Sequence, residues 1–282
     1  MRDTIPELGI ITDEVAPEVE EALATAMDWG LRRFELREGR TGRFPAFTPG
    51  EVRAVEAARA AGAQITAVSP GLFKGVVSDK ARLRRELDDV LPRAIELARR
   101  FEVPVLIAFG FQRYRGELPS GRMRAMQAFE RAARQVAEAG MVLALENEPD
   151  FWIDRPAEAA AMLDEIGHPA LRLNWDPANL HWGGQVPTRA DFLAVRPYLA
   201  GVHVKDYYPA RPEAPWLPVG EGTTPWDEIL PWLVHETDLP HLTIETHCTP
   251  LRVCSERALA NLRRLLAACI RGEVARDPED GR

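Results

Sequence analysis

The chain has 282 residues, 46% of them hydrophobic, and a formal net charge of −8. This is enough for a large core in one big domain or two small ones, and the acidic balance disfavours nucleic acid as a partner. The N-terminal residues MRDTIPELGIITDE are not a signal peptide, and no run approaches the ~20 apolar residues that cross a bilayer. We therefore expect a cytoplasmic protein without a membrane partner, its three cysteines reduced and packed in the core.

Eight β-rich runs follow one another along the chain, separated by segments with helical periodicity. The predicted strands span 8–12, 32–37, 64–69, 103–109, 142–146, 171–176, 201–205 and 242–246. Thr48 and Thr224, each followed by proline, are predicted to cap helices. Glycines stand where other helices should end, at Gly30, Gly62, Gly140 and Gly167.

Strand and helix alternate eight times, which predicts an α/β protein with a single (β/α)8 TIM barrel. The barrel should occupy residues 1–271, and the polar segment 272–282 should form a flexible tail. A doubly wound open sheet is the alternative. Such a sheet usually has fewer strands and often carries a glycine-rich loop after the first strand, whereas the corresponding segment here, TDEVAPE, has no glycine.

Polar side chains end four consecutive predicted strands, namely Glu146, Asp176, His203 and Glu245. In a barrel these ends meet at one rim, where neighbouring strands are about 4.8 Å apart. A single acid at a strand end is more often a helix cap or the partner of an arginine. Four such groups together would repel one another without a cation. Three carboxylates and an imidazole suit one divalent metal ion, Mn²⁺, Mg²⁺, Co²⁺ or Zn²⁺.

Other side chains at these strand ends are candidates for the wall of a pocket. Aromatic residues gather there, namely Phe109, Phe111, Trp152, Trp175, Trp182, Tyr207 and Trp216, and such a wall around a polar centre suits a sugar. Lys205, His181 and His247 are candidates for binding substrate, while Glu148 and Asp206 are expected to cap helices or support the ligands. The long segment 206–224 holds four prolines and is predicted to be a lid or substrate loop. The remaining histidines, His168, His235 and His241, are predicted to lie at the surface.

The segments LALENEP, LNWDPANL, GVHVKD, VGEGTTPW and IETH, in this order, resemble the xylose isomerase-like TIM-barrel superfamily and its sugar isomerase and epimerase branch. The resemblance implies that Glu146, Asp176, His203 and Glu245 hold one divalent metal and that the two glutamates are the catalytic acid/base pair. Many relatives place a substrate-contacting histidine where this chain has Asn179, so Asn179 joins Trp175, Lys205, His181 and His247 as a candidate for binding substrate. The stretches TDEV and SPGLFK resemble a less characterised subgroup, which implies that Lys74 reaches the pocket.

The function implied is a metal-dependent isomerase or epimerase that acts on a small sugar or keto-sugar through a metal-stabilised enediolate. A dehydratase or lyase acting on a keto-sugar or cyclitol is the main alternative. An AP endonuclease of the same superfamily needs more than the six histidines present and a basic face. A non-catalytic sugar-binding barrel would not need the pair Glu146 and Glu245. The substrate, its phosphorylation, the native metal and the oligomeric state, including a homo-oligomer, stay open.

Overall fold

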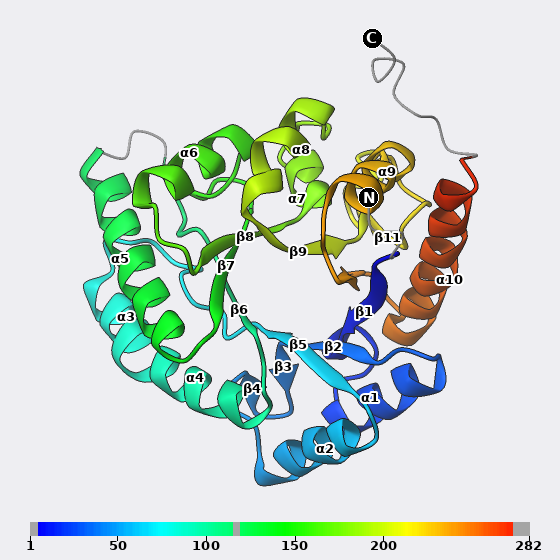
Figure 1. Ribbon diagram of the computed structural model, residues 1–282, viewed down its shortest axis with the longest axis horizontal. Coiled ribbons are helices and arrows are strands. Elements are labelled where there is room, and N and C mark those ends of the chain that lie inside the picture. The colour runs from blue at the N-terminus through cyan, green and yellow to red at the C-terminus, as the bar shows by residue number, and fades with distance from the viewer. Residues whose placement is uncertain (1–4, 115–118, 273–282) are drawn as a thin grey trace.

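The computed structural model describes residues 5–114 and 119–272, which fold into a closed barrel of parallel strands (Figure 1). The barrel strands are β1 (Glu7–Ile11), β2 (Arg33–Leu36), β5 (Gln64–Val68), β6 (Val105–Ala108), β7 (Val142–Glu146), β8 (Leu171–Trp175), β9 (Leu199–Val204) and β12 (His241–Ile244). They are hydrogen-bonded in the order β1-β12-β9-β8-β7-β6-β5-β2, and β2 pairs with β1 to close the ring. The predicted (β/α)8 barrel is confirmed, and the open doubly wound sheet is excluded.

Helices form a ring around the barrel (Figure 1). They are α1 (Val19–Asp28), α2 (Pro49–Ala60), α3 (Lys80–Arg85), α4 (Leu91–Arg100), α5 (Pro119–Glu138), α6 (Pro156–Ile166), α7 (Pro177–Trp182), α8 (Arg189–Val195), α9 (Trp226–Glu236) and α10 (Leu251–Ile270). None of the helices in the described part of the chain is long and apolar enough to cross a membrane. Of the predicted tail 272–282, all residues after Gly272 lie outside the described ranges.

The sequence signals for helix ends hold with one exception. At the start of α2, Thr48 Oγ1 accepts a hydrogen bond from the Glu51 backbone N–H at 3.2 Å, and the Glu51 carboxylate accepts one from the Thr48 N–H at 2.7 Å. Gly30, Gly62, Gly140 and Gly167 all have the positive φ expected after a helix. Thr224 differs from the prediction, because α9 begins without a side-chain cap.

The hydrophobic core lies mainly between the strands and the helices. A second, small cluster consists of Ala67, Ile107 and Ala144 on three adjacent strands. Side chains alternate along a strand, so Ala144 points to the same side as Glu146, which faces the inside of the barrel. Two alanines and an isoleucine therefore pack inside the barrel below the polar rim. The three cysteines are free and buried, as predicted.

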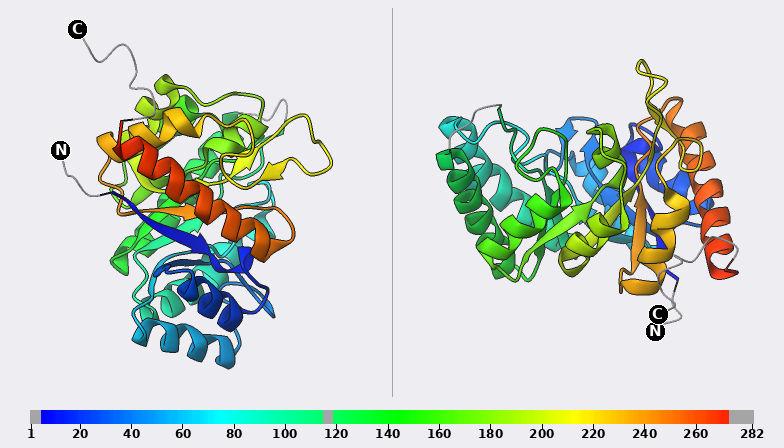
Figure 2. Two further views of the ribbon diagram at one scale, coloured as in Figure 1. Left: turned by 90° about the vertical axis from the view of Figure 1, so that its right-hand side faces the viewer. Right: turned by 90° about the horizontal axis from the view of Figure 1, so that it is seen from above.

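Two short hairpins extend the rim formed by the carboxyl ends of the strands. One joins β3 (Glu38–Gly39) to β4 (Gly42–Arg43), and the other joins β10 (Asp206–Tyr207) to β11 (Trp216–Leu217). Figure 2 shows that the β10–β11 segment projects from the end of the barrel opposite to the start of β1. The fully buried Asp206 carboxylate holds this segment, since it accepts hydrogen bonds from the backbone N–H groups of Gly220, Gly222 and Thr224.

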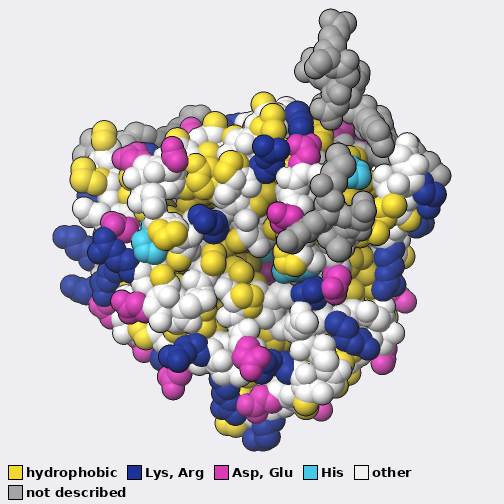
Figure 3. All heavy atoms as spheres, viewed as in Figure 1, with side chains coloured by type: hydrophobic (Ala, Val, Ile, Leu, Met, Phe, Trp, Pro, Cys, Tyr) yellow, Lys and Arg dark blue, Asp and Glu magenta, His cyan; other side chains and the backbone are white. Residues whose placement is uncertain are grey.

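The end of the barrel where β1 begins carries charged side chains of both signs around the outer helices (Figure 3). At this end His241 corrects the prediction of a surface histidine, because it starts β12 and is only 8% exposed. Its neighbour in register on β1 is Glu7, and Arg33 is close enough to repel a charged ring. Burial, helped by Arg33, lowers the pKa of His241 to about 4.

Candidate active site

A cavity of about 610 Å³ opens at the carboxyl ends of the barrel strands. Its lining side chains are Glu35, Arg37, Glu38, Arg43, Ser69, Lys74, Phe109, Glu146, Glu148, Asn179, Trp182, His203, Lys205, Trp216, Glu245 and His247. A groove of about 880 Å³ between α4 and α5 is larger, but none of the predicted site residues lines it. The mouth of the barrel is therefore the candidate active site.

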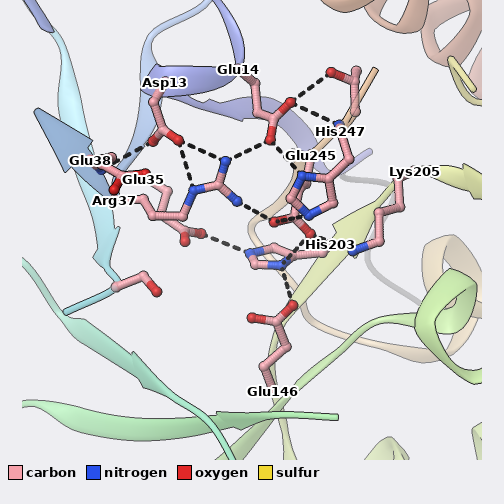
Figure 4. Close-up of polar contacts among 12 residues, drawn as sticks. Asp13, Glu14, Glu35, Arg37, Glu38, Glu146, His203, Lys205, Glu245 and His247 are labelled. Carbon is pink, nitrogen blue, oxygen red and sulfur yellow. Dashed lines mark hydrogen bonds and ion pairs between the residues drawn. The ribbon is translucent and has the colours of Figure 1, made fainter. Parts of the chain in front are cut away.

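The four predicted metal ligands converge at this mouth. One donor atom from each of them lies within 4.8 Å of the other three, and all four side chains are buried: Glu146, Asp176, His203 and Glu245. His203 Nδ1 is 3.2 Å from Glu146 Oε1 and 3.4 Å from Glu245 Oε2 (Figure 4). The ligands come from or directly follow β7, β8, β9 and β12, which are consecutive around the barrel.

Two features indicate that these residues fit a divalent cation. Asp176 Oδ2 is buried and needs a positive charge beside it, which the Lys205 ammonium supplies with Nζ 2.7 Å away. On the other side of the imidazole, Glu35 Oε2 lies 2.9 Å from His203 Nε2. A carboxylate in this position holds the ring so that Nδ1 faces the cluster as a ligand. The donor set, with three carboxylates and one imidazole, suits Mg²⁺, Mn²⁺, Co²⁺ or Zn²⁺.

The cluster attracts positive charge strongly. Lys205 is only 1% exposed, and its ammonium nitrogen is 2.7 Å from both Asp176 Oδ2 and Glu245 Oε2. Burial opposes ionisation of Lys205, but the two carboxylates outweigh it and raise its pKa. Burial likewise opposes charge on His203, yet Glu35 and Glu146 hold its pKa well above the usual range. A bound divalent cation would balance the negative charge of the same carboxylates.

Arg37 lies among three carboxylates on the other side of Glu245 (Figure 4). Its guanidinium is 2.7 Å from Asp13 Oδ2, 2.6 Å from Glu14 Oε1 and 2.5 Å from Glu245 Oε1. The sequence-based prediction missed this group and also Glu35. The sequence does carry a signal for both residues, because Glu35 lies near the end of β2 and Arg37 directly follows it, as the metal ligands end or follow their strands.

His247 contacts the same two glutamates as Arg37. Its Nε2 is 3.1 Å from Glu245 Oε1, and its Nδ1 is 3.2 Å from Glu14 Oε1. Burial opposes charge on the ring, but Glu245 raises the pKa of His247 to about 9. For Glu14, burial is outweighed by the hydrogen bond with His247 and the charge of Arg37, which lower its pKa to about 2. Glu245 Oε1 is thus held by two cations at neutral pH.

Four of the six predicted substrate-binding residues line the cavity, namely Lys74, Asn179, Lys205 and His247. The Asn179 side-chain amide donates a hydrogen bond to the Asn147 carbonyl at 3.0 Å. Lys74 Nζ lies 3.4 Å from Glu148 Oε1 and 4.0 Å from the centre of the Phe109 ring.

The other two, Trp175 and His181, lie behind the cavity wall. Trp175 is fully buried and packs against Phe192, with ring centres 6.1 Å apart, so it belongs to the core and not to a substrate surface. His181 is 8% exposed, and its Nδ1 is 3.3 Å from Thr224 Oγ1. Its ring packs edge-on against Tyr207, and burial lowers its pKa. Both residues therefore support the rim and do not face the cavity.

The predicted aromatic wall is present in part. Phe109, Trp182 and Trp216 line the cavity, and the two tryptophan rings meet edge-on with centres 5.6 Å apart. Trp152 and Phe111 do not line it and are buried in the core. Trp216 reaches the cavity because the β10–β11 hairpin places it there, 5.9 Å from the ring of His247.

A family model described as xylose isomerase-like TIM barrel matches residues 23–269. The chain belongs to this family. A curated relative, the 2-epi-5-epi-valiolone 7-phosphate 2-epimerase of Actinoplanes sp., is 30% identical over 224 residues, which cover 76% of this chain and 78% of the relative. The predicted superfamily is confirmed.

Two solved structures share the fold. The structure of an L-ribulose 3-epimerase has a TM-score of 0.79 and 17% identity, covering 98% of this chain and 99% of that one. A xylose isomerase-like TIM barrel protein from Mycobacterium smegmatis, in complex with magnesium, has a TM-score of 0.71 and 20% identity, covering 95% and 100%. Together with the family and its curated epimerase relative, the barrel identifies the protein as an enzyme, so the prediction of an enzyme is confirmed.

Proposed function

We propose that this protein is a divalent-metal-dependent sugar isomerase or epimerase in which Glu146 and Glu245 are the acid/base pair. The observation that carries the proposal is that both carboxylates line the cavity and both approach His203 Nδ1, at 3.2 and 3.4 Å. These three residues and Asp176 are the set that would hold the cation. When bound, a divalent cation polarises a substrate carbonyl and acidifies the neighbouring C–H.

The two glutamates are assigned different steps of the proton transfer. Burial opposes ionisation of Glu245, but His247 and Lys205 hold its pKa well below the usual range. Glu245 is therefore a carboxylate at neutral pH and is assigned the first proton abstraction. Burial opposes ionisation of Glu146, but His203 outweighs it and lowers its pKa, so Glu146 takes up a proton from solvent before it returns one to the resulting enediolate. Glu245 then releases the abstracted proton to solvent, which completes the cycle. Return to the opposite face of the same carbon gives an epimer, and return to the adjacent carbon gives an isomer.

The cavity wall supports a polyhydroxylated substrate. Phe109, Trp182 and Trp216 offer flat apolar faces for the C–H groups of a sugar or cyclitol, while Asn179 and Lys74 offer polar groups for its hydroxyls. The Actinoplanes relative is named as an epimerase, and we extend that class of reaction to this chain. An epimerase is thereby favoured over an isomerase.

Exchange with solvent tests the proposal. The protein is incubated in D₂O with Mg²⁺ or Mn²⁺ and a panel of ketoses and hydroxylated cyclic ketones, and the products are followed by NMR. Deuterium at the carbon next to the carbonyl, with no loss of water, is the expected result. A product that has lost water, with a new enone signal, would replace the proposal by a dehydratase, for which His247 and Lys205 are the nearest additional acids. The absence of exchange across the panel with metal-loaded protein would contradict it.

A further inference from the structure

Arg43 is built into the cavity wall by several contacts. It ends β4 of the β3–β4 hairpin, and its guanidinium donates from Nε to the Ser69 carbonyl at 3.3 Å and from Nη2 to Ser69 Oγ at 3.2 Å. The chain passes so close at Gly71 that a Cβ there would lie 2.9 Å from Arg43 Cδ. Gly71 also has a φ of 74°, which favours glycine. The absence of a side chain at Gly71 thus leaves room for Arg43 to pack against the rim of the cavity.

Arg43 differs from the other cations of the cavity in having no carboxylate partner. Arg37, Lys74 and Lys205 each form ion pairs, whereas Arg43 forms none within residues 5–114 and 119–272, and its Nη1 has no hydrogen-bond partner there. Burial, together with repulsion from Arg37, outweighs the attraction of Glu38, Glu146 and Asp13 and lowers the pKa of Arg43. A partly buried guanidinium without a counter-charge is costly, and an anion placed beside it removes that cost.

Two further polar groups face the same part of the cavity. Ser69 is only 1% exposed and lines the cavity; its Oγ accepts from Arg43, so its own hydroxyl proton is available to a ligand. Lys74 Nζ lies 4.0 Å from the centre of the Phe109 ring, and the Arg43 guanidinium carbon lies 5.7 Å from the same centre. Arg43, Ser69 and Lys74 together form a basic group, which we call the Arg43 group.

Two carboxylates also line this side of the cavity, and neither forms an ion pair with Arg43 in the described structure. Glu148 pairs with Lys74, with Lys74 Nζ 3.4 Å from Glu148 Oε1. Glu38 is opposite Arg43 in the hairpin register, but it is exposed and forms no ion pair with it in the described structure. Arg43 therefore lines the cavity with two of its donors on Ser69 and with Nη1 unpartnered in the described structure.

The position of the Arg43 group in the barrel decides which end of a bound substrate it would contact. Ser69 directly follows β5, and β5 stands four places from β9 in either direction around the barrel. The group thus faces His203 and Lys205, which come from β9 or follow it, across the mouth. A substrate whose carbonyl end reacts at Glu146 and Glu245 extends its far end toward Arg43. This orientation of the substrate rests on the proposed function, which places the reacting carbonyl at Glu146 and Glu245.

We propose that the Arg43 group is an anion subsite and that the substrate is a sugar or cyclitol with a phosphate ester or carboxylate at the end remote from its reacting carbonyl. Both anions match the planar donor pattern of arginine. The subsite selects the anionic substrate, and Glu146 and Glu245 act at its other end.

Binding of a matched ligand series tests the subsite. D-Fructose, D-fructose 6-phosphate and D-fructuronate differ only at the sixth carbon, and inorganic phosphate serves as the minimal anion. In titration calorimetry with Mg²⁺ present, at least one of the two anionic ketoses is expected to bind roughly tenfold or more tightly than D-fructose. This advantage should shrink as salt is raised. The anionic ketose that gains more identifies the ester or the carboxylate.

Arg43→Gln should remove this advantage and leave D-fructose binding within roughly threefold of the wild type, and Lys74→Gln should reduce it by a smaller factor. Arg40→Gln is the matched control, because Arg40 lies in the same hairpin with its side chain 70% exposed. If phosphate were bound by the metal ion alone, its affinity would be unchanged in Arg43→Gln. Anionic ketoses and phosphate that bind no better than D-fructose, or that bind equally well to Arg43→Gln, overturn the subsite.

The two proposals fail separately. Deuterium exchange on a neutral ketose, without any preference for anionic ligands, leaves the isomerase or epimerase standing and removes the subsite. Binding of anionic ligands that depends on Arg43, without exchange or epimerisation of any ketose, leaves the subsite standing and removes the proposed reaction.

Discussion

Glu35 Oε2 lies 2.9 Å from His203 Nε2, and His203 Nδ1 faces Glu146 on the other side of the ring. Glu35 is 1% exposed, and burial raises its pKa. The imidazole thus lies between Glu35 from β2 on one side and the carboxylates of the proposed ligand set on the other. Such a contact at the far nitrogen fixes the orientation of a metal-binding histidine and increases its basicity.

Replacing Glu35 with Gln should therefore weaken divalent metal binding roughly tenfold, because the loss of a supporting carboxylate typically costs 10–100-fold in affinity. Competition with a chromophoric chelator measures this affinity without any substrate. Glu38→Gln is the control, since Glu38 also lines the cavity but is exposed and does not contact the ligands. Unchanged affinity in Glu35→Gln would show that His203 is oriented without Glu35.

Replacing His203 with Ala should abolish stoichiometric metal binding, because His203 is the only nitrogen donor of the proposed ligand set. The barrel should stay folded, since residues at this rim serve function more than core packing. Elemental analysis of protein equilibrated with Mn²⁺ and then desalted measures the bound metal, and circular dichroism checks the fold. A variant that retains about one ion per chain would refute the assigned ligand set.

Glu146→Gln and Glu245→Gln should each lower turnover by roughly 10²–10⁴-fold on a substrate found by the exchange experiment, since general acid–base catalysis typically supplies that much. Initial rates at saturating metal separate a loss of catalysis from a loss of metal. Glu96→Gln, an exposed position on α4, is the control. Near-normal turnover in either site variant would contradict the two-glutamate mechanism.

Asp206→Ala should loosen the β10–β11 hairpin, because the buried carboxylate accepts hydrogen bonds from the N–H groups of Gly220, Gly222 and Thr224. The expected loss is about 2–4 kcal/mol in the free energy of unfolding, as three backbone donors, of which that of Thr224 is buried, lose their acceptor. Urea unfolding measures it, and faster proteolytic cleavage within 207–224 locates it. Asp227→Ala, at an exposed position in the first turn of α9, should change neither.

His241 makes stability depend on pH in the acid range. Its pKa is lowered from 6.5 to about 4 in the folded protein, so the unfolded chain binds the proton first. The stability contributed by the neutral ring is complete above pH 6.5 and is lost as the pH falls toward 4. From pH 7 to 5 this loss is about 2 kcal/mol. Urea unfolding at both pH values should therefore show a smaller decrease for His241→Leu than for the wild type; equal decreases would exclude this role.

The residues at the strand ends show how much of the candidate site could be predicted from the sequence. Glu146, Asp176, His203 and Glu245 could be predicted to converge because each ends a β-rich run and a parallel barrel brings such ends to one rim. Glu35 and Arg37 end a run of the same kind, but this run lies far along the chain from the four consecutive runs that carry the ligands, and nothing local in the sequence joins them. Barrel closure places β2 next to β1 and β1 next to β12, so the ends of the chain meet at the same site.

The directions of the Trp175 and Trp182 side chains could not be predicted from their positions near a strand end. Both follow the pattern of an aromatic residue near a strand end, but Trp175 lies between Asn174 and Asp176 and turns outward to pack on Phe192. Trp182, one helix later, faces the cavity. Their directions depend on strand alternation combined with which face is covered by helices, and this is decided only in the folded barrel.

The sequence by itself determined the order of strands and helices, their ends and the residue types at the rim, because these depend on local periodicity, capping and turn chemistry. The tertiary structure alone decided which rim residues touch. The contacts of Arg37 with Glu245, and of Glu35 with His203, join residues that are 208 and 168 positions apart. The unpaired state of Arg43 likewise depends on where the hairpin packs against Ser69. Long-range contacts of this kind arise from barrel closure and loop packing, for which no local pattern carries a signal.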